Sequence, residues 1–234
     1  MALNASQAEA AAELVAAKLQ SLKGSPRFVF IGGGSVPLHL MVLRSPDELR
    51  PTKDIDVVIS VATYADYNDI SAQLRKLGFK DDMQLPIRWH LGDLMVDVLP
   101  TTDIGHGLGN RWFHLVMEHA IKRKLSGGTV VELAAPPVLL ATKLEAFVDR
   151  GMKDVLASHD LEDIITLLDG RPEIVEEARS MPEDLRKYLA EQAAALLALD
   201  GLAYVLEGNL ETTGEDEGRA AAVRSRLLSL AEMH

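Results

Sequence analysis

The first half of the chain alternates short apolar segments with turns, a pattern typical of a β-sheet surrounded by helices. Apolar runs predict strands over residues 27–31, 55–61, 86–91, 94–99 and 129–133. The Gly92-Asp93 turn between the third and fourth of these runs predicts a β-hairpin. Helical spacing of apolar positions predicts helices over residues 6–22, 35–43 and 63–77. We expect the first helix to begin at a capping box over residues 6–9, and the third to begin at Thr63 and end at Gly78.

From Pro136 onward the apolar spacing is helical to the last residue. Breaks in this helical pattern are expected at Gly170, Pro182 and residues 208–218. Two segments are expected to be loops: the glycine-containing residues 103–110 and the acidic residues 211–218. The pattern therefore predicts an α/β domain over residues 1–135 and a helical domain over residues 136–234.

The composition is that of a folded protein, with 234 residues of which 47% are hydrophobic and 25% charged. The absence of cysteine excludes disulfides, thiol nucleophiles and cysteine-ligated zinc. The net charge of −11 does not favour nucleic acid as a partner of the whole surface, but it is compatible with a nucleotide bound through divalent metals. No segment has the pattern of a signal peptide or a membrane span, so we expect a cytoplasmic protein without a membrane partner.

Three aspartates are the strongest chemical signal. Asp54 and Asp56 begin an apolar strand two residues apart, so their side chains should share one face of the sheet. Asp97 is the one charged residue within the apolar run 94–99, where an unpaired carboxylate would be unfavourable. A shared divalent cation would offset this charge, and oxygen ligands of this kind suit Mg²⁺ or Mn²⁺. Taken alone, the Asp-x-Asp pair is equally compatible with a solvated strand end.

A glycine turn follows the first predicted strand. The glycines of residues 32–34 would let the backbone approach a phosphate, the following helix start would supply N–H groups, and Ser35 would add a hydroxyl. A dinucleotide-binding fingerprint is the main alternative, but Pro37 stands where its third glycine is required. A turn without a ligand is the other alternative.

These motifs resemble those of the AbiEii-type nucleotidyltransferases, which are abortive-infection and toxin-like members of the polymerase-β-like superfamily. The resemblance is carried by Gly33, Gly34 and Ser35, followed by Arg50, Thr52, Asp54 and Asp56, with the third carboxylate of the family at Asp97. Further along, the Lys, the Arg and the Asp-x-x-Asp helix of the family fall on Lys143, Arg150, Asp160 and Asp163. His159 departs from the pattern, because the family has Arg or Lys before the first Asp. The resemblance covers about residues 28–168.

The resemblance implies a minimal nucleotidyltransferase fold, in which a small mixed β-sheet is flanked by helices and a C-terminal helical region completes the active site. It implies transfer of an NMP from an NTP to a hydroxyl of an RNA such as tRNA, of a protein, or of a small molecule. Two Mg²⁺ or Mn²⁺ ions are expected at Asp54, Asp56 and Asp97. The expected nucleotide-binding residues are Gly33, Gly34, Ser35, Arg50, Thr52 and Lys143, and the expected catalytic residues are Asp54, Asp56, Asp97, Lys143 and Asp160.

The resemblance also implies a toxin of a toxin–antitoxin or phage-defence system, with an antitoxin protein as partner. The alternative function is a catalytically inactive nucleotide-binding or interaction protein with the same fold. Without the resemblance, Lys143 fits a solvated helix face, and Asp160 fits a first-turn carboxylate favoured by the helix dipole. The basic residues 122–124, with Trp112 and Phe113, either bind a base and a phosphate or form a helix packed by its aromatic residues. Arg88 and Trp89 are open to the same two interpretations.

Overall fold

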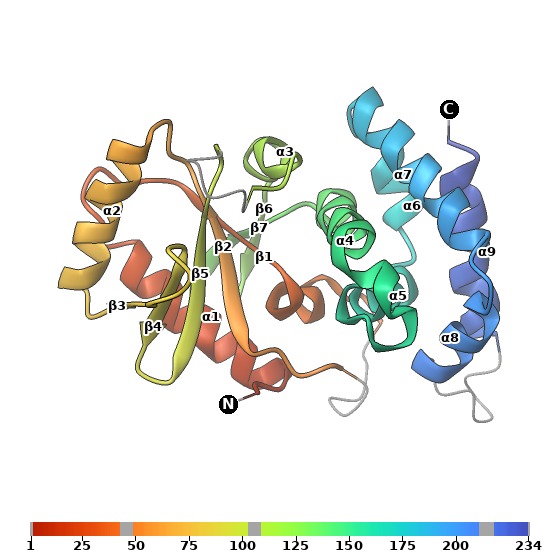
Figure 1. Cartoon of the computed structure of the whole chain (residues 1–234), viewed down its shortest axis with the longest axis horizontal. Coiled ribbons are helices and arrows are strands. Elements are labelled where there is room, and N and C mark those ends of the chain that lie inside the picture. The colour runs from red at the N-terminus through yellow and green to blue at the C-terminus, as the bar shows by residue number, and fades with distance from the viewer. Residues whose placement is uncertain (1, 43–48, 103–108, 211–217, 234) are drawn as a thin grey trace. The chain divides into compact units, whose positions relative to one another are not determined.

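In a computed structural model, the chain divides into two compact units, which are described separately (Figure 1). The first unit consists of Met1–Leu38 and Ser45–Ala135, and the second of His39–Arg44 and Pro136–His234. The structure describes residues 2–42, 49–102, 109–210 and 218–233. Except for residues 109–110 and 218, the two predicted loops lie outside the described residues.

Within the described part of the first unit, seven strands form one mixed sheet in the order β3-β4-β5-β2-β1-β7-β6. The strands are β1 (Phe28–Ile31), β2 (Asp54–Ile59), β3 (Lys80–Asp81), β4 (Arg88–Leu91), β5 (Leu94–Pro100), β6 (Ile121–Lys124) and β7 (Val130–Leu133). β2 is parallel to β5 and β1 is parallel to β7, whereas the other neighbours are antiparallel. The predicted hairpin is confirmed, since Leu91 pairs with Leu94 across the Gly92-Asp93 turn.

One face of this sheet forms the core of the first unit. The helices of the unit are α1 (Ala5–Leu19), α2 (Tyr64–Lys76) and α3 (Phe113–Glu118), together with the 3₁₀ helix η1 (Gly33–His39). Alternate residues of β2, Ile55, Val57 and Ile59, are buried in one apolar cluster with side chains of α1 and α2. Because side chains alternate along a strand, Asp54 and Asp56 project from the opposite face. The mixed sheet flanked by helices confirms the predicted fold class.

Two local predictions for the first unit are wrong, and a third holds in part. The N-cap of α1 is Asn4, whose side chain accepts from the Gln7 backbone while the Gln7 side chain accepts from the Asn4 backbone, both at 3.0 Å. The helix predicted over residues 35–43 is the shorter 3₁₀ helix η1, which contains Pro37. Proline has no N–H for a bond to the residue four positions earlier, so a regular α-helix is disfavoured there. The aromatic residues Trp112 and Phe113 are buried at the start of α3, as one of the two interpretations expected, but the basic residues 122–124 belong to the edge strand β6.

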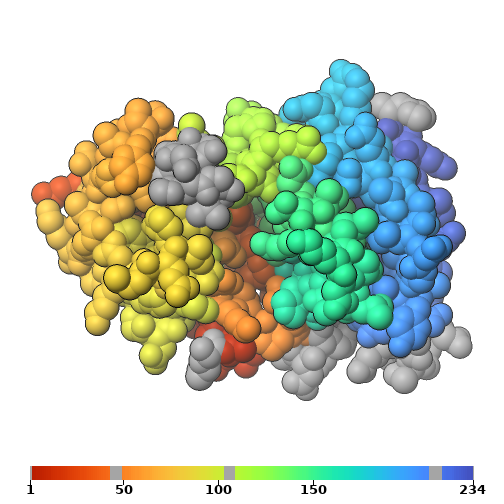
Figure 2. Space-filling view, in the orientation of Figure 1, coloured from red at the N-terminus to blue at the C-terminus, as the bar shows by residue number. Residues whose placement is uncertain are grey.

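The described part of the second unit is helical. Its α-helices are α4 (Pro136–Arg150), α5 (His159–Gly170), α6 (Ile174–Arg179), α7 (Glu183–Leu197), α8 (Leu202–Asn209) and α9 (Arg219–Ala231), with the 3₁₀ helices η3 (Gly151–Lys153) and η4 (Val155–Ala157) between α4 and α5. Figure 2 shows atoms of the segment from α4 to α5 in green and atoms of the later helical region in blue on this face. The predicted breaks at Gly170 and Pro182 are confirmed. A further break was not predicted, and it falls at Gly201, where φ is +81°.

The segment after η1 joins the second unit through backbone hydrogen bonds. The N–H groups of Met41 and Val42 donate to the Gly170 carbonyl at 2.8 and 3.2 Å. Arg171 also donates to the His39 carbonyl at 2.7 Å. Among the described residues, no single helix is long and apolar enough to cross a membrane, and α7 and α8 meet the criterion only as a pair bent by 97°.

Candidate active site

The structure brings the three predicted aspartates together on the face of the sheet opposite α1 and α2. Asp56 of β2 is the register partner of Asp97 on the parallel strand β5, and Asp54 lies two residues before Asp56. One carboxylate oxygen from each of the three lies within 4.8 Å of the other two. Asp97 is buried, whereas Asp54 and Asp56 are partly exposed. The predicted meeting of three carboxylates at one place is therefore confirmed.

Arg88 places a cation within this carboxylate cluster. Its Nε and Nη2 donate to the two oxygens of Asp97 at 2.8 and 2.7 Å, and Nη2 also donates to Asp54 at 3.1 Å. The hydrogen bonds to Asp97 raise the pKa of the Arg88 guanidinium above its usual value. The Arg88 guanidinium thus offsets part of the negative charge of the carboxylates. Three carboxylate oxygens this close together are also a ligand set suited to Mg²⁺ or Mn²⁺.

The sequence left Arg88 open between binding a phosphate and packing, although the hairpin contains the signal that pairs it with Asp97. A two-residue turn at 92–93 pairs residue 91 with 94, so counting back along both strands places Arg88 opposite Asp97. The structure shows this register. Residues facing each other across an antiparallel pair lie on the same face of the sheet, so an Arg there is well placed to meet the carboxylate.

Gly32 is the glycine that the carboxylate cluster requires. Its φ is +74°, in the left-handed region. A Cβ at this position would lie 1.9 Å from Oδ2 of Asp56, so any other residue would force the Asp56 side chain to move. Ser35 is buried, and its hydroxyl and backbone N–H donate to the Gly32 carbonyl at 2.9 and 3.2 Å. The prediction named Gly33 and Gly34, which begin η1, but the close approach to a carboxylate is at Gly32.

Thr52 and Arg50 precede the first carboxylate. Thr52 is buried and exchanges two backbone hydrogen bonds with Leu3. Its hydroxyl lies 3.1 Å from the Asp54 carbonyl and 3.4 Å from Oδ1 of Asp54, so it can hold the start of β2 in place. Arg50 is partly exposed and donates to the Pro51 carbonyl at 3.3 Å.

The structure places Lys143 and Asp160 in the second unit. The Lys143 Nζ lies 2.6 Å from Asp163 and 3.3 Å from Asp160, and all three side chains are at most 10% exposed. Arg150 donates to both oxygens of Asp160 at 2.7 and 3.0 Å. Burial raises the pKa of Asp160, but the hydrogen bond from Arg150 and the charges of Lys143 and Arg150 lower it overall. Lys143 is therefore not on a solvated helix face, and Asp160 is more than a first-turn carboxylate.

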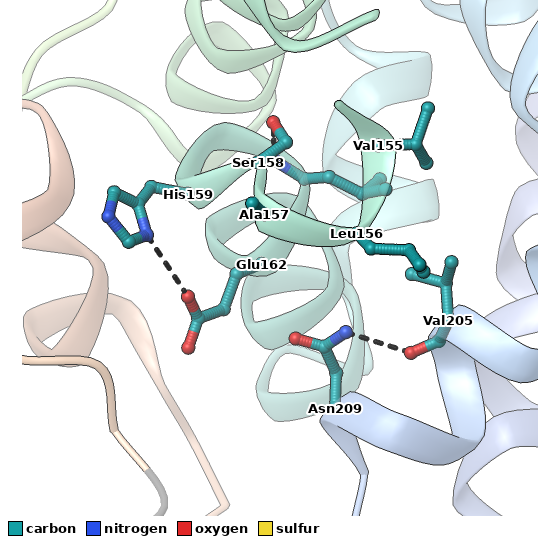
Figure 3. A pocket seen from close by; sticks show the side chains of 9 residues that line it. Val155, Leu156, Ala157, Ser158, His159, Glu162, Val205 and Asn209 are labelled. Carbon is teal, nitrogen blue, oxygen red and sulfur yellow. Dashed lines mark hydrogen bonds and ion pairs between the residues drawn. The ribbon is translucent and has the colours of Figure 1, made fainter. Parts of the chain in front are cut away.

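A hollow of about 180 Å³ lies between η4, the start of α5 and α8 in the second unit (Figure 3). Its polar side chains are already engaged. His159 faces Glu162 at 3.5 Å, the Asn209 amide donates to the Val205 carbonyl at 2.8 Å, and the Ser158 hydroxyl accepts from the Leu161 N–H. The walls are otherwise aliphatic, so this hollow lacks the convergent charges that a nucleotide would need.

The comparisons with known proteins support the fold. No family model matches the sequence, and no curated protein matches it. The chain is similar to the solution structure of the antibiotic-resistance factor ANT(2″)-Ia, with 15% identity and a TM-score of 0.50 over 83% of this chain and 96% of that one. A crystal structure of ANT(2″)-Ia in complex with adenylyl-2″-tobramycin aligns with 12% identity and a TM-score of 0.39, over 94% and 98% of the two chains. The chain thus shares the fold of ANT(2″)-Ia, a mixed sheet flanked by helices and followed by a helical region.

Proposed function

We propose that the protein is a metal-dependent nucleotidyltransferase that transfers an NMP from an NTP to a hydroxyl group of an acceptor. The observation that carries the proposal is the meeting of Asp54, Asp56 and Asp97 within 4.8 Å on a sheet of the nucleotidyltransferase fold. Mg²⁺ or Mn²⁺ held by these three carboxylates would reduce the charge on the phosphates and stabilise the attacking and leaving oxygens. In the transfer, the acceptor oxygen forms a bond to the α-phosphorus, and the bond to the departing pyrophosphate breaks.

The residues around the carboxylates support distinct parts of this reaction. We assign the phosphate contacts to the backbone of Gly33 and Gly34, at the start of η1. Ser35 shapes the turn, and its hydroxyl would have to turn away from the Gly32 carbonyl to donate to a phosphate. Both oxygens of Asp97 accept hydrogen bonds from Arg88. We therefore assign Asp97 first to metal binding, and it could take up the acceptor proton only at a lone pair that neither Arg88 nor the metal occupies.

Four further residues enter the proposal through the resemblance to the AbiEii-type family. Arg50 and Thr52 would contribute to nucleotide binding, with Thr52 acting through the position of Asp54. Lys143 of the helical unit would bind the triphosphate, and Asp160 would support the reaction by orienting Lys143, with which it pairs at 3.3 Å. The helical unit would thus complete the active site. The same resemblance extends the proposal to a toxin with an antitoxin partner, for which growth arrest on expression, abolished by Asp54→Asn, is the test.

An RNA is the acceptor that the charge distribution favours. Residues 1–135 carry 14 Lys and Arg against 15 Asp and Glu, whereas residues 136–234 carry 10 against 20. All four residues of the edge strand β6 are exposed, and no described residue forms an ion pair with Lys122, Arg123 or Lys124. Consecutive cations of this kind suit the phosphates of a nucleic acid. Trp112 and Phe113 are buried, so base stacking on them is excluded.

A cationic small molecule is the second candidate acceptor. Its support is the twofold excess of acidic over basic residues after residue 135 and the fold shared with ANT(2″)-Ia, which was solved with adenylyl-2″-tobramycin. A cation would be attracted by this half of the chain, whereas RNA would be repelled.

The decisive experiment is transfer of label from each of the four α-labelled NTPs, with Mg²⁺ or Mn²⁺, to total RNA, total protein and tobramycin in separate reactions. We expect label in the RNA fraction, and label in tobramycin alone would select the second acceptor. Asp54→Asn should abolish transfer, while Asp69→Asn, an exposed aspartate of α2, should leave it intact. An NTP and a metal that bind without any transfer would instead support the inactive nucleotide-binding protein.

A further inference from the structure

Arg88 gives the carboxylate cluster a cation of its own. The guanidinium bonds both oxygens of Asp97 and one oxygen of Asp54, at 2.7 to 3.1 Å. The side chains of Arg88, Asp54 and Asp97 are 23%, 29% and 11% exposed, so water does not fully screen these contacts. Arg88 and Asp97 are also register partners in the β4–β5 hairpin, so the strands hold the pair together.

We propose that Arg88 is the resident counter-cation of the metal site, which positions Asp97 and Asp54 in the metal-free protein and competes with a divalent ion for them. The inference rests on the proposed function, because it assumes that the cluster binds metal. Three carboxylates within 4.8 Å repel one another unless a positive charge offsets them. The positive charge of Arg88 also repels a divalent metal ion. Arg88 therefore stabilises the arrangement of the carboxylates and at the same time lowers their affinity for metal.

The size of the effect follows from the charges and their separation. A divalent ion about 5 Å from a guanidinium is repelled, even at the dielectric constant of water, enough to weaken its binding about tenfold. Substitution of Arg88 by a neutral residue should therefore tighten metal binding, although it removes a partner of two aspartates. A residue that only oriented Asp97 would have the opposite effect, because its loss would weaken the site.

The test is Mn²⁺ binding by isothermal titration calorimetry, which does not depend on turnover. We expect Arg88→Gln to bind Mn²⁺ about tenfold more tightly than wild type, and Arg88→Lys, which keeps the charge, to stay within about threefold. Without metal, Arg88→Gln should have a lower Tm than wild type. Saturating Mn²⁺ should reduce this difference in Tm. Arg75→Gln is the matched control, since Arg75 forms a similar two-bond pair with Asp81 elsewhere in the same unit and should leave the Kd unchanged.

A measurement on the wild-type protein keeps the inference testable if Arg88→Gln does not fold. Mg²⁺ should displace the Arg88 guanidinium from Asp97 and so shift the NMR signal of the Arg88 Nε–H. The signal of the Arg75 Nε–H should not shift. An unmoved Arg88 signal at saturating Mg²⁺, or equal or weaker Mn²⁺ binding by Arg88→Gln, would overturn the inference and leave the proposed function standing. Absence of Mn²⁺ binding by the wild type at millimolar concentration would overturn both.

Discussion

Replacing Gly32 by Ala should remove Asp56 from the metal site. A Cβ at this position would lie 1.9 Å from Oδ2 and 2.6 Å from Cγ of Asp56. Ordinary contact begins near 3.4 Å, so the carboxylate would have to retreat by about 1.5 Å. Metal ligands keep their bonding distances to within about 0.2 Å, so a shift of that size ends ligation in the original geometry. We expect Gly32→Ala to bind Mn²⁺ about 10- to 100-fold more weakly than wild type, measured by calorimetry.

Gly24→Ala is the matched control for the backbone. Gly24 has a φ of +83°, close to that of Gly32, but nothing lies within 4 Å of an added Cβ. Both substitutions should lower the free energy of unfolding, measured in urea, by about 1–2 kcal/mol, because both force an L-residue into the left-handed region. Only Gly32→Ala should also lose metal binding. Equal Mn²⁺ affinities for the two variants would refute the reasoning.

Three further predictions concern the buried charges of the helical unit and the basic edge strand. Lys143→Met should lower the free energy of unfolding by about 3 kcal/mol in urea, because it removes the ammonium group that pairs with the buried Asp163 at 2.6 Å and the buried Asp160 at 3.3 Å, and a loss below about 1 kcal/mol would contradict this. Because Arg150 and Lys143 lower the pKa of Asp160 despite its burial, its stabilising effect should be complete above an unfolded pKa of about 3.9 and be lost as the pH falls further. The difference in free energy of unfolding between wild type and Asp160→Asn should therefore shrink as the pH falls below about 3.9. A difference that stays constant with pH would argue against the ion pairs of Asp160 with Arg150 and Lys143. Changing Lys122 and Lys124 together to Glu should weaken binding of single-stranded RNA and reduce the slope of log K against log salt by at least about 1.4, whereas an unchanged slope would exclude β6 as the RNA-binding surface.

Predictions from the sequence succeeded where the cause is local. Thr63 caps α2 as expected, with its hydroxyl accepting from the Asp66 N–H at 3.2 Å. The β4–β5 hairpin follows from its two-residue turn and two apolar runs. The edge strand β6 could not be found in this way, because its four residues are all exposed and show no apolar alternation. Its extended form depends on pairing with β7.

The candidate site was predictable in its residues but not in its arrangement. An Asp within an apolar strand identified Asp97, yet its position beside Asp56 depends on β5 lying next to β2 in parallel register, which no local signal specifies. The role of Gly32 likewise depends on how β1 pairs with β2, since Ile31 faces Asp56 across that pair. Residues 39–42 were predicted as part of a helix in the first domain, but hydrogen bonds to the distant Gly170 place them with the second unit.

The charged cluster on the sheet and the charged cluster in the helical unit differ in their balance of carboxylates and cations. In the helical unit, two carboxylates, Asp160 and Asp163, meet two cations, Lys143 and Arg150, so the group is neutral without a ligand. On the sheet, three carboxylates lie within 4.8 Å of one another, and the guanidinium of Arg88 pairs with two of them, Asp54 and Asp97. Three carboxylates this close together repel one another, and a divalent cation would add positive charge that offsets the repulsion. We therefore expect a metal ion to bind at the sheet cluster, and we expect the helical cluster to hold Lys143 in place.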